Sequence, residues 1–124
     1  MGKYGRAAIR ARDLYISGIA RDPVEAWKRA TSEVFSTPAA RDKGCPKSTF
    51  LGLCEEGLVW GVARGEYTKS RDNKKYALAA VALLKSNPSL ASDQDSLWSQ
   101  VGEKKKPNSQ MDVVIALWNE GAIR

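Results

Sequence analysis

The amino-acid sequence predicts an all-α protein of about six helices, arranged as two similar halves of three helices each. Apolar residues recur at the three- and four-residue spacing of one helix face. Signals for helix starts and ends recur in the same order along the chain, at offsets of 72, 71, 61 and 64 residues. The 124 residues suffice for one domain with a buried core. We therefore expect a single helical domain, 1–124, with repeat units at about 3–59 and 73–123.

The first helix of each half is rich in alanine. In KYGRAAIRARDLYI and KYALAAVALL, an alanine-rich stripe follows Tyr4 and Tyr76 at the same spacing. Gly18 is expected to end the first of these helices, because glycine readily adopts the left-handed conformation. Asp72 or Asn73 is expected to cap the second, which the following SNP should end.

The second helix of each half contains a tryptophan five residues after an aspartate, in DPVEAW and DQDSLW. Asp22 can accept from the free amides of the first turn, Pro23 suits the first helical position, and Glu25 completes a capping box. Trp27 and Trp98 are expected to be buried in similar surroundings.

The third helices lie in PKSTFLGLCEEGLV and PNSQMDVVIALWNEGAI. Ser48 and Ser109 are the predicted N-caps, the second helped by Asp112. Gly57 and Gly121 stand where the helices should end. If these ends are Schellman turns, the residue after each glycine contacts the residue four positions before that glycine.

The connector between the halves, residues 58–71, is expected to form a short hairpin or an irregular loop. Acidic residues in a last helical turn oppose the helix dipole. We therefore expect Glu55, Glu56 and Glu120 each to pair with a basic residue of another helix.

Composition excludes several classes of function. The chain has no histidine and only two cysteines, so it cannot build a tetrahedral zinc site alone or use a histidine base. No phosphate-binding loop motif is present. We expect no metal, no cofactor and no catalytic residues, and an enzyme ranks third among the hypotheses. Cys45, near Lys43 and Lys47, is the best residue for a reactive-thiol hypothesis, whereas Cys54 is expected to pack in the core.

No apolar run is long enough to span a bilayer, and the arginine-containing N-terminus does not fit a secretory signal. We expect a cytoplasmic protein without a membrane partner. A disulfide between the two cysteines is not expected in that reducing compartment.

Three blocks, GCPKSTFLGLCEEGLV, YTKSRDNKKYALAAVALL and NSQMDVVIALWNEGAI, resemble the signatures of a small bacterial domain family of unknown function. The resemblance spans nearly the whole chain and implies a complete member of that family. It implies no activity, cofactor or site residue.

The net charge of +6 is concentrated in residues 1–30, 64–75 and 103–106. Clustered basic residues are typical of a phosphate-binding surface, although a solvated face of a basic protein has the same pattern. The favoured hypothesis is a non-enzymatic nucleic-acid-binding domain that uses basic loops and helix starts. Its candidate residues are Arg64, Lys69, Arg71, Lys74 and Lys75 for phosphates, with Asn108 and Gln110 for reading a base edge. The structural alternative is that Asn108 or Ser109 caps the last helix.

The alternative hypothesis is a protein-interaction adaptor or homodimeric module. Trp60 lies outside every helical stripe, and an exposed tryptophan in a loop is a typical interface anchor. An equally good interpretation places Trp60 in the gap between the two halves.

Overall fold

The computed structural model describes residues 2–124 and confirms the all-α prediction. Within this range there is no β-strand. Six helices have eight or more residues: α1 (Lys3–Ile16), α2 (Pro23–Val34), α4 (Gly44–Glu55), α5 (Arg71–Ser86), α6 (Gln94–Val101) and α7 (Gln110–Asn119). Two short elements were not predicted, the single turn α3 (Pro38–Arg41) and the 3₁₀ helix η1 (Pro88–Ser92). In the described part of the chain, no helix is both long and apolar enough to cross a membrane.

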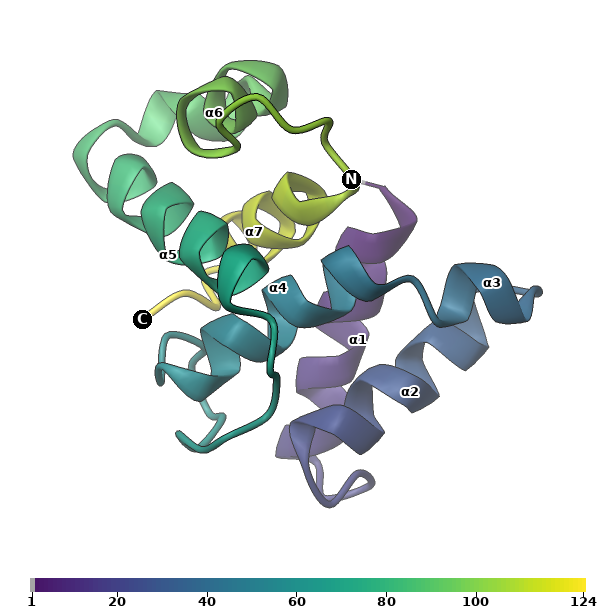
Figure 1. The fold of residues 1–124 in the computed structure, drawn as a ribbon. Helices are drawn as coiled ribbons and strands as arrows, with labels where there is room; N and C mark the ends of the chain where they lie inside the picture. The colour runs from purple at the N-terminus through teal and green to yellow at the C-terminus, as the bar shows by residue number, and fades with distance from the viewer. Residues whose placement is uncertain (1) are drawn as a thin grey trace.

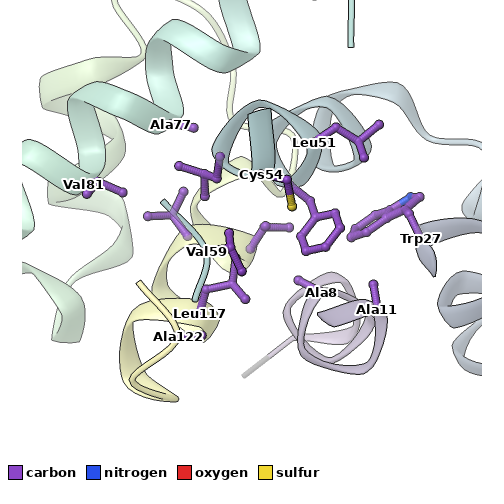
Figure 2. Packing of buried hydrophobic residues seen from close by; sticks show 14 of the residues in the cluster. Ala8, Ala11, Trp27, Leu51, Cys54, Val59, Ala77, Val81, Leu117 and Ala122 are labelled. Atoms are coloured by element: carbon purple, nitrogen blue, oxygen red, sulfur yellow. The ribbon is translucent and has the colours of Figure 1, made fainter. Parts of the chain in front are cut away.

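The two most apolar helices, α4 and α7, occupy the centre of the fold. They pack against each other, α7 also packs against α1, and α4 also packs against α5 (Figure 1). Their fully buried side chains include Leu53 of α4 and Val114 of α7. Figure 2 shows the cluster extending from Trp27 at one end to Val81 at the other. The third helix of each half therefore lies between elements of both halves.

The predicted cap of α2 and the predicted ends of α4 and α7 are confirmed. The Asp22 carboxylate accepts a hydrogen bond of 2.8 Å from the Glu25 amide. Schellman turns end α4 and α7: the amide of Leu58 donates to the carbonyl of Leu53 and that of Ala122 to Leu117, at 3.0 and 2.9 Å. The glycines at 57 and 121 have φ values of 72° and 71°, the left-handed region in which a side chain is strained.

The residues after these two turns pair with each other. Val59 forms an antiparallel bridge with Ile123, flanked by hydrogen bonds from the Trp60 amide to the Ala122 carbonyl and from the Arg124 amide to the Leu58 carbonyl. The hairpin considered for residues 58–71 does not form. Val59 finds its partner at the end of the chain instead, because both Schellman turns project extended backbone toward the same point.

Of three other predicted caps, two are wrong, and Ser109 occupies the N-cap position of α7 without a capping hydrogen bond from its side chain. Ser48 lies inside α4, which begins four residues earlier, at Gly44, with Pro46 tolerated in its first turn. The backbone of Ser109 is left-handed, with a φ of 68°. The N-cap position of α5 is Ser70, not residues 72–73.

Asp112 caps a different helix from the one that contains it. Its two carboxylate oxygens accept hydrogen bonds from the amides of Gly2 and Gly5, each at 2.9 Å, at the start of α1. A Cβ atom at Gly5 would lie 2.7 Å from the Cβ of Ala116, so glycine lets α1 approach α7 closely. The beginnings of α1 and α7 are therefore joined by one carboxylate.

The internal duplication stays a prediction. Trp27 and Trp98 are both buried, but their neighbours differ. Trp27 stacks on Phe50 of the third helix at 5.3 Å between ring centroids, whereas Trp98 meets the edge of Tyr76 from the first helix of its half at 5.4 Å. The expectation of similar surroundings therefore fails.

Replacing Asp112 with alanine should lower the free energy of unfolding by about 1–2 kcal/mol, because two amides at the start of α1 lose their acceptor. Urea denaturation followed by circular dichroism measures this change. Asp95→Ala is the control, since Asp95 is exposed in the first turn of α6. An equal loss in both variants would show that the effect comes from the helix dipole alone.

Candidate functional site

Two of the three basic stretches meet at one end of the molecule. The ammonium group of Lys105 lies 3.1 Å from Asp72, and that of Lys75 lies 3.2 Å from Glu103. These contacts bring the loop before α7 against the first turns of α5. We define the basic end as the six exposed cations of the two segments: Lys69, Arg71, Lys75, Lys104, Lys105 and Lys106.

The loop at the basic end is held in place by Trp98. The indole Nε1 donates to the carbonyl of Lys105 at 3.0 Å, and Gly102 packs so closely on the ring that a Cβ would clash with it. Glu103, at the start of the basic run, and Ser109, three residues after its end, have φ values of 58° and 68°. Non-glycine residues in this region are strained, and such strain tends to concentrate at functional sites.

Lys105 keeps its charge at neutral pH. Its pKa is raised, chiefly by its interaction with the Tyr76 hydroxyl and then by Asp72. The ammonium group also lies 5.7 Å from the centre of the Tyr76 ring, within cation–π range. The three lysines of residues 104–106 are not among the predicted site residues. The run EKKK is visible in the sequence as a basic stretch. Its position against α5 is shown only by the structure.

The predicted phosphate-binding residues are only partly brought together. Lys69 and Arg71 are exposed in the same segment as Lys75, and both also line the groove that contains Glu55. Arg64 is exposed but packs its side chain over Gly57, at the end of α4.

The two predicted amide side chains do not form part of this surface. Gln110 is 4% exposed, and its Nε2 donates to Asn73 at 3.3 Å. Its Oε1 accepts from the backbone amide of Asn108, which is half-buried. Gln110 therefore joins α7 to the first turn of α5, and it cannot reach a base edge while it does so.

Lys74 forms ion pairs within the protein and is not part of the basic end. Its ammonium group lies 2.7 Å from both Glu55 and Glu56, which confirms the expected partner for these two acids. Within residues 2–124, Glu120 has no such partner at ion-pair distance. The backbone at Gly52 approaches Lys74 so closely that a Cβ there would lie 2.9 Å from the lysine Cβ.

Glu55 lies at the wall of a groove of about 610 Å³ between the end of α4 and the start of α5. Burial by itself would raise its pKa. Hydrogen bonds from Lys74 and from the backbone amides of Thr68 and Tyr67 outweigh that effect and lower the pKa to about 2. Glu55 is thus a charged anchor for the connector rather than a proton donor.

Trp60 lies on another part of the surface. Its side chain is 48% exposed, and the guanidinium of Arg124 lies 4.9 Å from the ring centroid. Arg12 donates through Nε to the Trp60 carbonyl at 2.7 Å. Ile16, itself 50% exposed, contacts the backbone at Gly61. We define the Trp60 surface as Trp60, Ile16, Arg12 and Arg124.

Neither cysteine is in a disulfide. Cys54 is buried in the core, and burial raises the pKa of its thiol. Cys45 is half-buried in the first turn of α4. No cluster of three potential metal-ligating side chains occurs among residues 2–124.

Glu55→Gln should destabilise the protein at pH 7 by about 2 kcal/mol, allowing for solvent screening at the groove. Because the folded-state pKa is lowered, the stabilisation is present above the ordinary pKa of 4.5 and is lost as the pH falls toward 2. The variant should therefore show a flatter decline of stability between these pH values, measured by urea denaturation at each pH.

Glu56→Gln is the matched control. Glu56 contacts the same lysine but is 40% exposed, so its effect should be much smaller. Equal pH profiles for the two variants would contradict the assigned role of Glu55.

Comparisons with known proteins add one finding. Neither the curated proteins nor the solved structures contain a significant match to this chain. A family model matches residues 1–124, and its description is a family of unknown function (DUF6979). The chain therefore belongs to this family of unknown function.

Proposed function

We propose that this protein is a non-enzymatic nucleic-acid-binding domain that contacts phosphates through the basic end. The observation that carries the proposal is the meeting of residues 69–75 with residues 103–106. Within these two segments, six exposed cations accompany two acids, Asp72 and Glu103. Lys69 and Arg71 also line the groove that contains Glu55, Glu56 and Glu66. Clustering of cations raises the local concentration of polyanions and steers their approach.

The acids at the basic end do not prevent phosphate binding. The pairs Lys75–Glu103 and Lys105–Asp72 have side chains that are 57–70% exposed. Exposed ion pairs of this kind contribute about 0–1 kcal/mol each. Phosphates can therefore replace the carboxylates at small cost, while Trp98 keeps the loop in position.

The mode of binding follows from what the fold leaves free. Helices α4 and α7 are core elements, so neither is available to enter a major groove as a recognition helix. Gln110 is buried, which removes the best candidate for base contacts. We therefore expect binding that depends on backbone phosphates and hardly on sequence.

The test is fluorescence anisotropy with labelled duplex DNA, single-stranded DNA and RNA, measured over a series of salt concentrations. Neutralisation of four to five phosphates should give a slope of about −4 in log K against log salt for duplex DNA. Lys104→Gln/Lys106→Gln should reduce the slope by about 1–2. Both lysines are exposed, and neither forms an ion pair within the described chain.

The control is Arg21→Gln/Arg29→Gln, which removes the same charge from α2 and the turn before it, where both arginines pair with Glu25. It should leave the slope nearly unchanged. A similar loss in both double variants would reduce the effect to net charge, and undetectable binding of all three nucleic acids at low salt would end the proposal.

The Trp60 surface supports a second candidate function, binding of a protein partner. The exposed indole and Ile16 supply an apolar anchor, and Arg12 and Arg124 flank it with positive charge. This combination favours an acidic segment that also carries aliphatic side chains. A second copy of the chain fits less well, because it would bring the same arginines together.

Selection from a phage-displayed library of random peptides tests this candidate. The selected peptides should combine acidic and aliphatic residues, and synthetic versions should bind at least tenfold more weakly to Trp60→Ala. Ile19→Ala is the control, since Ile19 is 53% exposed but belongs to another groove. Peptides without acids, or sedimentation showing a dimer that Trp60→Ala disrupts, would contradict an acidic partner.

A further inference from the structure

The indole nitrogen of Trp27 is the one buried side-chain nitrogen or oxygen in residues 2–124 that has no hydrogen-bond partner. The residue is 1% exposed, and its ring stacks on Phe50. A buried donor without an acceptor destabilises the folded protein, and most such donors in proteins are satisfied. Trp98 shows the usual solution, because its nitrogen donates to the Lys105 carbonyl.

Trp27 also lines a groove of about 440 Å³ between α2, α3 and the start of α4. Figure 2 places the Trp27 indole at the end of the core cluster that is far from Val81. In Figure 1, α2 and α3 lie on the side of α4 away from α5 and α6. The groove therefore involves none of the elements that form the basic end.

The walls of the groove are suited to a small anion. Lys28, Arg41 and Lys47 line it, against Asp42 as its one acid. The Nε of Arg41 donates to the Phe35 carbonyl at 2.8 Å, which positions the guanidinium group. The two terminal nitrogens of the guanidinium do not take part in this hydrogen bond. Positively charged side chains thus line the same groove as Trp27, whose Nε1 is covered in this structure.

The groove also has an apolar part. Its two hydroxyl groups already donate to backbone carbonyls and are not free to donate to a ligand. Val24 and Pro38 contribute apolar surface beside the indole. The Thr31 hydroxyl donates to carbonyls within α2, and Ser32 does the same. A ligand with a flat or aliphatic body and a negatively charged oxygen matches this arrangement.

We propose that this groove binds a small molecule bearing a carboxylate or phosphate, whose oxygen accepts the hydrogen bond from Trp27 Nε1 while Lys28, Arg41 and Lys47 balance its charge. The nitrogen has less than 1 Å² of exposed surface, so a small movement of the groove wall must accompany binding. The wall includes Lys28 and Lys47, long side chains that can change rotamer readily. The proposal is independent of nucleic-acid binding at the basic end.

The experiment follows the indole N–H signals of the four tryptophans by two-dimensional ¹H–¹⁵N NMR. Benzoate and phenyl phosphate are the probes, and benzamide supplies the same ring with an uncharged acceptor. Titration with one of the anions should move the Trp27 signal downfield in a saturable way, while the Trp98 signal stays in place. Comparison of benzoate with phenyl phosphate identifies the preferred anion.

Trp27→Phe keeps an aromatic ring on Phe50 but removes the donor, and it should weaken binding of the preferred anion at least tenfold. Trp98→Phe is the matched control and should bind as the wild type does. Lys28→Gln and Lys47→Gln should each weaken anion binding without affecting benzamide.

Three results would overturn the proposal: no movement of the Trp27 signal with either anion, benzamide binding as tightly as the anions, or unchanged anion affinity in a folded Trp27→Phe variant. If Trp27→Phe does not fold, the wild-type titration and the two lysine variants decide the matter alone.

Discussion

The burial of α4 and α7 against each other is the constraint on which the rest of this fold depends. Both helices are apolar on nearly all sides, so neither can be a surface helix of a stable protein. Each therefore needs neighbours on every face, and the alanine-rich α1 and α5 provide them at close range. Truncating a fully buried leucine such as Leu53 or Leu117 to alanine typically costs about 2–5 kcal/mol, a large part of a small domain's stability.

This central packing places helix ends close together, and their polar groups are satisfied between elements. The Asp112 carboxylate of α7 accepts hydrogen bonds from amides at the start of α1. The Glu55 carboxylate of α4 accepts from the connector and from Lys74. Gln110 of α7 donates to Asn73 of α5. Lys74 and Gln110, which the sequence predicts as surface groups, are therefore already paired within the protein. Of the remaining cations, Lys75 and Lys105 pair with the exposed acids Glu103 and Asp72.

Much of the fold could be predicted from local signals. Asp22, Gly57 and Gly121 act through neighbours within a few residues, so their roles follow from the printed sequence. Asp112 could not be assigned in this way, because its partners lie 107 and 110 residues away. The sequence also predicts Lys74 and Gln110 as site residues, although both side chains bond within the protein. A pattern of charges or amides does not show which of these side chains the packing of the core turns inward.

The two tryptophan helices show how similar local sequence leads to different chemistry. In the second half, the nitrogen of Trp98 is satisfied by the backbone of Lys105, so the aromatic core fixes the position of the basic loop. In the first half, the chain after α2 forms α3 and passes to α4 without offering an acceptor to Trp27. The two connecting segments differ accordingly: residues 102–109 supply an acceptor to Trp98, whereas residues 35–43 supply none to Trp27. If the halves arose by duplication, their connectors are where they acquired distinct surfaces, and connecting segments commonly carry function.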